Sequence, residues 1–185
     1  MKVLAAGTLV GILAAVTGCS SMADKTESVM SHMHNATLSD AEIMSVLSTA
    51  NMGEISQGQI ALQKAQHIQV KNFAQKMVTD HTDNNQKGQA LGARLGITPQ
   101  NNDISMKLKK DSDDIIMKLN KVDMKDFDKE YMDSQVKIHK MVLKTIDDKL
   151  LPNAQNAELR NLLVQTRPAI AMHLQMAEQL QKMVK

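Results

Sequence analysis

Residues 68–95 read IQVKNFAQKMVTDHTDNNQKGQALGARL. Apolar side chains recur in this stretch every three or four positions, which is the period of an amphipathic helix. Gly96 and Pro99 follow the stretch, and a glycine just past the last turn with a proline soon after is a common helix ending. The pattern therefore predicts one long helix whose apolar face is formed by Val70, Phe73, Ala74, Met77, Leu91 and Leu95.

The same period predicts one further helix before this one and one after it. Ser39 and Glu42 stand three residues apart at the start of the first, over residues 40–65, where they can form a capping box. The third covers residues 126–150 and ends before Pro152, because proline cannot continue the backbone hydrogen bonds of a helix.

A fourth helix and the connections complete the predicted architecture. It spans residues 154–183, and Pro168 within it predicts a kink or a restart near Thr166. Only a few residues connect helix one to helix two, and only a few connect helix three to helix four. Connections this short predict that each pair forms an antiparallel hairpin. Residues 96–125 form a long crossover with an amphipathic turn-forming segment of its own. We therefore expect an all-α, four-helix ferritin-like bundle with one long crossover. An ordinary up-down bundle with a long surface loop is the alternative.

The composition narrows the class of protein. The 185 residues are 43% apolar and only 2% aromatic, with 22 basic and 20 acidic side chains. A formal net charge of +2 gives no electrostatic reason to expect nucleic-acid binding. A single cysteine excludes a disulfide framework and any cysteine-based zinc site. With these classes of protein excluded, the composition favours a small helical domain.

The N-terminal residues predict export and lipid attachment. Residues 1–18 carry one basic side chain, Lys2, before an apolar run that is too short for a permanent membrane span. The run ends in the sequence VTGC, which resembles a bacterial lipobox whose cysteine, here Cys19, is acylated and becomes the new N-terminus. An ordinary signal peptide with an incidental cysteine is the alternative.

The lipobox resemblance implies a location and a domain organisation. Ser20 follows the cysteine where an inner-membrane retention signal would have aspartate, which favours an outer-membrane lipoprotein facing the periplasm. Residues 19–39 are polar and small, and we expect a flexible tether there. Residues 40–185 then form the helical bundle domain. The expected partner is the membrane, reached through the lipid anchor at Cys19, while a protein partner and a homo-oligomer are left open.

Four ionisable residues fall on or beside the apolar faces: Glu54, His81, His139 and His173. Each lies near the midpoint of a different helix, and the midpoints of packed helices of similar length meet at one level. Ionisable groups in an apolar core are costly unless they satisfy one another or bind a cation. Three imidazoles and a carboxylate are reasonable ligands for a single transition-metal ion, with Fe, Mn, Cu and Zn not distinguished.

The surroundings of these residues limit the chemistry. Further polar side chains are available to hydrogen-bond the ligands, namely Asp80 and Gln135. Carboxylate-bridged di-iron bundles carry Glu-x-x-His motifs, but the residues three before His81 and His173 are Val78 and Ile170. Di-iron oxidase or ferroxidase activity is therefore disfavoured. A buried polar layer that sets helix register without any metal is the competing interpretation.

Several segments carry a resemblance to a known family. They are residues 51–55 (NMGEI), 70–81 (VKNFAQKMVTDH), 127–139 and 167–173. They resemble bacterial exported domains labelled "predicted outer membrane protein", a domain-of-unknown-function family with a ferritin-like fold, over about residues 38–182. The resemblance implies that fold and a location in the cell envelope, but no reaction. The family motif falls on Glu54, Asp80, His81, His139 and His173.

Two functions compete at this point. The first is a lipid-anchored periplasmic bundle that binds one transition-metal ion and acts in metal handling or envelope stress. The second is a non-catalytic envelope protein that has a structural or interaction role and a purely structural Glu/His layer. No catalytic residue is predicted in either case, and the sequence favours a protein that is not an enzyme.

Overall fold

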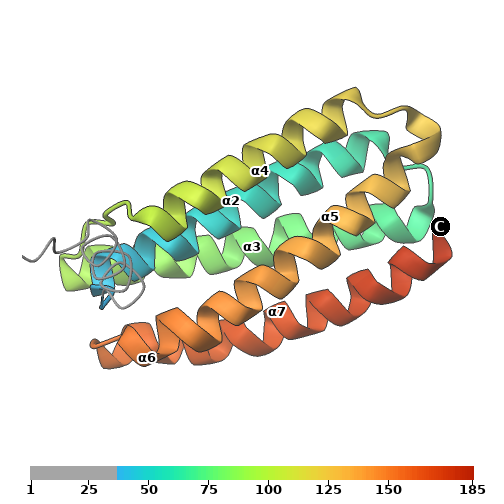
Figure 1. Cartoon of the computed structure of the whole chain (residues 1–185). Coiled ribbons are helices and arrows are strands. Elements are labelled where there is room, and N and C mark those ends of the chain that lie inside the picture. The colour runs from blue at the N-terminus through green and yellow to red at the C-terminus, as the bar shows by residue number, and fades with distance from the viewer. Residues whose placement is uncertain (1–36) are drawn as a thin grey trace, which may run out of the picture. The chain divides into compact units, whose positions relative to one another are not determined.

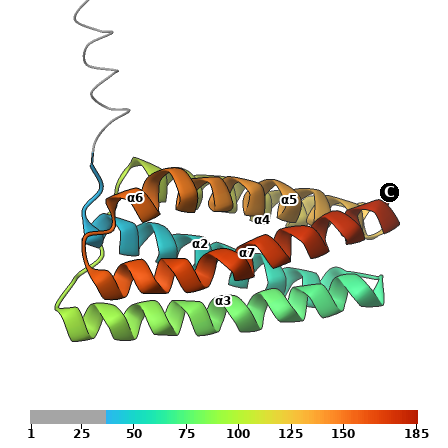
Figure 2. The ribbon, with the colours of Figure 1, turned by 90° about the horizontal axis from the view of Figure 1, so that it is seen from below.

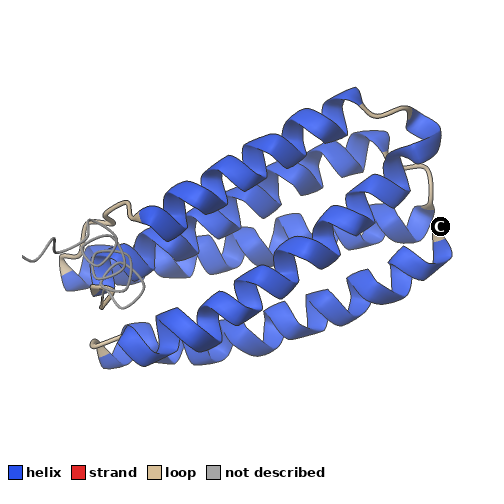
Figure 3. Cartoon of the chain, viewed as in Figure 1, coloured by secondary structure: helices blue, strands red, loops and turns tan. Residues whose placement is uncertain are grey.

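The computed structural model describes residues 37–185, and every regular element in that range is helical (Figures 1 and 3). Five long helices account for most of it, and a five-residue π-helix and a one-turn helix stand between the last two. In chain order the elements are α2 (Asp40–Lys64), α3 (Ile68–Leu95), α4 (Asp103–Lys121), α5 (Met124–Thr145), η1 (Ile146–Leu150), α6 (Leu151–Asn153) and α7 (Ala157–Met183). The expected all-α class is therefore confirmed for this part of the chain. The predicted signal, lipidated cysteine and most of the tether lie outside the described residues.

The long helices run roughly along one common direction and pack in pairs. Helices α2 and α3 pack against each other, as do α5 and α7, while α4 lies along the outside of α2 (Figure 1). Figure 2 shows that α3 and α7 also run side by side. This contact joins the two pairs. None of the helices in residues 37–185 is both long enough and apolar enough to cross a membrane.

Two of the predicted helix ends are present where the sequence placed them, the start of α2 and the end of α3. The Ser39 hydroxyl accepts from the backbone N–H of Glu42, and the Glu42 carboxylate accepts from the backbone N–H of Ser39 at 2.9 Å, which completes the capping box. Gly96 ends α3 in the left-handed region, at φ 66°. A residue without a Cβ adopts this conformation at little cost.

The predicted crossover differs most from the structure. Residues 103–121 form a full helix, α4, rather than a turn-forming segment in a long connection. Asn102 caps it through a hydrogen bond of 2.9 Å from the backbone N–H of Ser105. Three Lys–Asp pairs with i,i+4 spacing follow its solvent face, and each such pair adds a few tenths of a kcal/mol to a helix. Leu108 and Leu119 are buried on the opposite face.

The boundaries of the last two long helices also differ from prediction. The third predicted helix, residues 126–150, begins at Met124, and its last turn is the π-helix η1. The fourth predicted helix, residues 154–183, begins at Ala157. Of the two outcomes predicted at Pro168, a kink or a restart near Thr166, the restart is absent, because α7 is continuous to Met183. A proline removes the hydrogen bond to the carbonyl four residues earlier, which belongs to Val164. Because Val164 is exposed, water can solvate that carbonyl and the helix continues.

Two apolar clusters fill the bundle, and a polar layer lies between them along every helix. The first cluster includes Ile43, Leu47, Ile146, Leu159, Leu163 and Ile170. The second includes Ala61, Phe73, Met77, Phe127, Tyr131 and Ala177. Glu54, His81, His139 and His173 each fall between the two clusters on their own helix, and all are at most 3% exposed. The four helices thus bring these side chains to one level, as the midpoint argument expects.

Candidate metal centre

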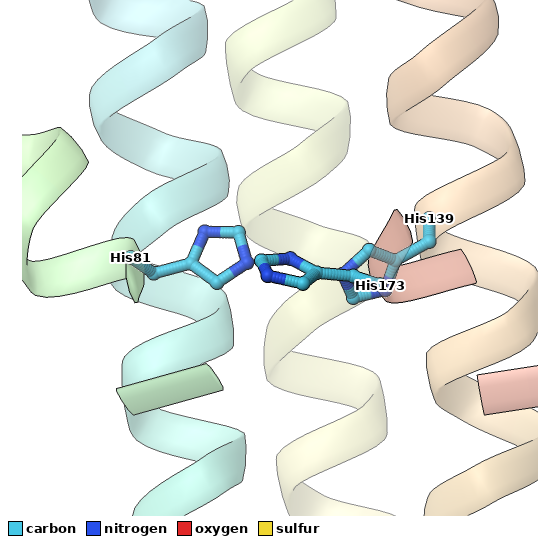
Figure 4. Close-up of side chains that lie close together, drawn as sticks. All are labelled: His81, His139 and His173. Carbon is cyan, nitrogen blue, oxygen red and sulfur yellow. The ribbon is translucent and has the colours of Figure 1, made fainter. Parts of the chain in front are cut away.

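Three histidines from three different helices meet in the polar layer. His81 comes from α3, His139 from α5 and His173 from α7, and their rings lie close together (Figure 4). One ring nitrogen from each lies within 4.8 Å of the others, and the ring centroids are 5.4–5.8 Å apart. The three side chains are 1–3% exposed. Among residues 37–185 this group of three could hold a metal ion.

His81 and His173 stand on the buried faces of their helices because apolar residues lie one turn away on the same face. His81 follows Met77 by four residues. His173 lies between Ile170 and Ala177, three residues after one and four before the other. All three of these apolar residues are buried. The helical period therefore turns both imidazoles towards the interior.

The outward nitrogen of every ring has a hydrogen-bond partner. The Nδ1 of His81 lies 2.9 Å from the Oδ1 of Asn51. The Nδ1 of His139 lies 2.9 Å from the backbone oxygen of Gln135. The Nε2 of His173 lies 2.7 Å from the Oδ2 of Asp80. All three partners are acceptors, so each of these ring nitrogens carries the proton and donates.

In a neutral ring the remaining nitrogen holds a lone pair. These atoms are Nε2 of His81, Nε2 of His139 and Nδ1 of His173, and all three are buried without a hydrogen-bond partner. Three acceptors thus gather with no donor among them, which is costly in an apolar interior. A hydrogen bond that fixes the outer nitrogen while the inner one is free is the usual arrangement of a metal-binding histidine.

Burial also keeps the rings of His81 and His173 neutral. Desolvation lowers the pKa of His81 well below its ordinary value of 6.5, and the neighbouring histidines lower it further. Desolvation likewise lowers the pKa of His173 to about 4, although the nearby Asp80 carboxylate acts in the opposite direction. Only the neutral imidazole can bind a metal, so both rings are in the competent form at neutral pH.

Glu54 lies beside the three histidines but is not a member of their group. Its Oε1 is 3.8 Å from the Nδ1 of His139, the ring nitrogen that faces away from the cluster. Both carboxylate oxygens are buried without a hydrogen-bond partner. Burial raises the pKa of Glu54 above its ordinary value, against the opposing influence of His139 and the Gln135 side chain. Its predicted role as a direct ligand stays a prediction.

The two other predicted polar residues contact the histidines. Asp80 bonds His173 on the facing helix rather than His81, its neighbour in the sequence. Gln135 supports His139 through its backbone oxygen, and its side chain donates to the Oε1 of Gln57 at 3.1 Å. The polar layer therefore extends from α5 to α2.

Sequence reasoning missed a chain of polar side chains behind His81. The amide of Asn51 donates to the Oδ1 of Asn84 at 2.9 Å, and Asn84 donates to the Oγ1 of Thr166 at 2.7 Å. Asn51 is only 4% exposed and stands four residues after the buried Leu47. The helical spacing that predicted a buried Glu54 could therefore also have predicted that Asn51 is buried.

Comparisons with known proteins place the chain in a family. Residues 25–180 match a family described as a domain of unknown function, DUF4142, and this range includes nearly all of the described helices. The chain belongs to the DUF4142 family. No curated protein and no solved structure matches it. The resemblance noted in the sequence is confirmed at the level of the family.

A cleft leads from the surface of this DUF4142 domain to the histidines. It lies between α3 and α7, has a volume of about 190 Å³, and reaches His81 and His173 but not His139. Its outer residues include Asp83, Lys87 and Gln165. The group of three histidines is therefore buried, yet a small solute has a polar route towards it.

Proposed function

We propose that this DUF4142 domain binds one divalent transition-metal ion through His81, His139 and His173. The observation that carries this proposal is the meeting of three histidine rings, each with one buried nitrogen that has no hydrogen-bond partner. A cation between the rings would satisfy all three at once. The outer nitrogen of each ring is already bonded, so the ligands are oriented before the ion arrives.

The donor atoms restrict which ions fit. Three imidazole nitrogens with no thiolate suit Zn²⁺, Cu²⁺ and Fe²⁺, and a nearby carboxylate such as that of Glu54 also suits Mn²⁺. A single inward carboxylate cannot bridge two irons in the manner of di-iron bundles. We therefore propose a site for a single ion, without oxidase or ferroxidase chemistry of the di-iron type.

We further propose that the architecture is ferritin-like. The first supporting observation is the pairing of the helices: α2 and α3 form one hairpin, and α5 and α7 form the other. The second is the long segment between the two hairpins, which contains α4. Ferritin-like folds join two such pairs by one long crossover and build their metal sites from side chains that face inward. Helix α4 would then be an elaboration of the crossover.

The location that we propose rests on the sequence alone. Residues 1–19 resemble a lipoprotein signal, so the bundle would be held by acyl chains on Cys19 at the periplasmic face of the outer membrane and act in metal handling or envelope stress. Labelling growing cells with radioactive palmitate tests the anchor. Label on the wild-type chain and none on a Cys19→Ala variant is the expected result.

Metal content is the direct test of the proposed site. Residues 20–185, purified without chelator or metal-affinity resin, should contain about one transition-metal ion per chain. The double variant His81→Gln/His173→Gln should contain none. His67→Asn is the matched control, because His67 caps α3 outside the cluster and asparagine is also a good cap. It should retain the metal.

The competing function is a structural or interaction protein whose polar layer binds no ion. Under that reading the wild-type protein would stay metal-free even after incubation with Mn, Fe, Cu and Zn salts. The double variant would change only the stability. This result would overturn the proposed metal site, and the search for function would move to partners in the envelope.

A further inference from the structure

The bound ion would have three protein ligands, whereas most of the ions considered take at least four. All three ligands are neutral imidazoles, so they leave the double positive charge of the ion uncompensated. We propose that the ion keeps one coordination position open towards the cleft between α3 and α7, and that a small inorganic anion binds there. This inference rests on the proposed metal site.

The positions of the rings give the direction of the open side. His81 and His173 form part of the floor of the cleft, whereas His139 does not line it. An ion held by all three rings therefore has His139 behind it and the cleft in front of it. The Nδ1 of His173, a buried nitrogen without a hydrogen-bond partner, belongs to the ring that borders the cleft.

The cleft changes gradually from exposed to buried along its depth. Asp83, Lys87 and Gln165 at the mouth are exposed, and Asn84 and Ala169 further in are half-buried. The floor is buried and consists of Asn51, His81, Leu162, Thr166, Ile170 and His173. Its volume of about 190 Å³ is below the range of about 300–1,000 Å³ typical for organic ligands. An ion of a few atoms fits this space.

The charges along the route favour an anion once the metal is bound. Asp80 already interacts with His173 at 2.7 Å and with Lys76 at 2.9 Å, so two positive or proton-donating groups compensate its charge. Within residues 37–185, Asp83 and Lys87 have no ion-pair partner, and their opposite charges largely cancel at the mouth. The dominant charge that an entering solute meets is therefore that of the metal.

The other candidate for the fourth position is Glu54, and its geometry is unfavourable. Its Oε1 is 3.8 Å from the outer nitrogen of His139, and Glu54 is not one of the residues whose ligand atoms lie within 4.8 Å of one another. Glu54 would have to leave this position to reach the ion. The position that faces the cleft needs no such movement.

The test uses the protein loaded with Co²⁺, whose visible absorption reports the coordination geometry, and sodium azide as the small anion. Azide should change the spectrum saturably, with one site per chain. The Ala169→Phe variant places a large ring in the cleft and should weaken or slow the azide response at least tenfold. Ala90→Phe is the control, because Ala90 is an exposed alanine of α3 that does not line the cleft. It should respond like the wild type.

Two further variants keep the result interpretable. Lys87→Glu alters only the exposed mouth, so it should fold normally and weaken azide binding about threefold through charge alone. Glu54→Gln should still bind azide if the fourth position is open. An azide response gained only in Glu54→Gln would show that Glu54 occupies that position and would overturn the proposal.

The failures of the two proposals are distinguishable. If Co²⁺ does not bind, the proposed metal site itself is wrong. If Co²⁺ binds but azide leaves the wild-type spectrum unchanged, the metal site stands and the open position is wrong. An unchanged azide response in both Ala169→Phe and Lys87→Glu would show that the anion does not enter through this cleft, which also overturns the inference.

Discussion

Asp80 on α3 and His173 on α7 are joined by a hydrogen bond of 2.7 Å between Oδ2 and Nε2. This bond crosses the contact between the two helix pairs and turns the Nδ1 of His173 towards the other histidines. Burial tends to raise the pKa of Asp80, but hydrogen bonds from Lys76 and His173 hold it below its ordinary value. The carboxylate is therefore charged at neutral pH and strengthens the ring as a ligand.

Asp80→Asn should weaken metal binding without abolishing the site. The amide can still accept a hydrogen bond, but it lacks the charge that makes His173 a better ligand. Loss of such an outer partner typically costs 10- to 100-fold in metal affinity. Competition with a coloured chelator would measure the dissociation constant, and the stoichiometry should stay at one ion per chain.

Lys76→Gln provides the control for this measurement. Lys76 pairs with the same carboxylate oxygen at 2.9 Å but is partly exposed and does not touch the histidine cluster. Its removal should change metal affinity only slightly, because exposed ion pairs contribute little. Equal effects of the two variants would show that Asp80 acts through general surface charge and not through His173.

Asn51→Ala should destabilise the metal-free protein. Asn51 accepts from His81 and donates to Asn84, so its removal leaves the buried Nδ1 of His81 and the half-buried Oδ1 of Asn84 without these partners. Each such group costs about 1–3 kcal/mol. Urea unfolding should therefore show a free energy of unfolding lower by about 2 kcal/mol or more.

The neighbouring Asn85 supplies the comparison. It is half-buried on the same helix as Asn84 and has no hydrogen-bonding role in the polar layer. Asn85→Ala should change the free energy of unfolding by about 0.5 kcal/mol or less. If Asn51→Ala had an equally small effect, water would be replacing its hydrogen bonds and the chain of amides would carry little of the stability.

The level at which the histidines meet could be predicted because it depends only on period and length. Met77 and Ile170 mark the apolar faces of their helices, and a polar residue one turn away must share that face. The partner of Asp80 could not be predicted in this way. Sequence neighbours on a helix point in different directions, so Asp80 faces α7 while His81 faces the interior.

Helix α4 shows a second limit of sequence reasoning. The apolar positions Leu108 and Leu119 were visible, but many charged residues surround them. Lys107, Lys109 and Lys110 pair with aspartates four residues later and support the helix on its solvent face. Its apolar side packs on α2, a contact that depends on distant residues and that local pattern does not reveal.

The same substitution should have opposite effects at two glycines. A Cβ at Gly58 would lie 2.8 Å from Cγ2 of Val78 and 3.1 Å from the backbone oxygen of Ala74, so α2 and α3 would have to separate. Overpacking of this kind costs about 1–3 kcal/mol. A Cβ at Gly88 would meet nothing within 4 Å. Gly88→Ala should therefore stabilise α3 by about 0.5–1 kcal/mol.

Thermal denaturation of the two variants distinguishes packing from helix propensity. Gly58→Ala should lower the Tm and Gly88→Ala should raise it. Since alanine is the better helix former at both positions, propensity alone would raise the Tm in both cases. Two increases would show that α2 and α3 have room to separate at Gly58.

The link between Asp147 on η1 and Arg167 on α7 predicts a pH-dependent stability. Arg167 donates through Nε to Oδ1 at 2.6 Å and through Nη2 to Oδ2 at 2.7 Å. These bonds, with the positive charge of Arg167, lower the pKa of Asp147 below its ordinary value of 3.8. A lowered pKa in the folded state stabilises the protein above the ordinary value, and the contribution disappears as the pH falls through the folded-state value.

Asp147→Asn should therefore have a lower Tm than the wild type at pH 7, and the difference should shrink as the pH falls below about 4. Denaturation curves at several pH values from 7 to 3 would measure it. Asp113→Asn removes an exposed i,i+4 pair on α4 and should show almost no difference at any pH. A Tm difference for Asp147→Asn that stayed constant down to pH 3 would contradict the prediction, because a neutral Asp147 would then contribute as much as a charged one and the contact with Arg167 would act through packing.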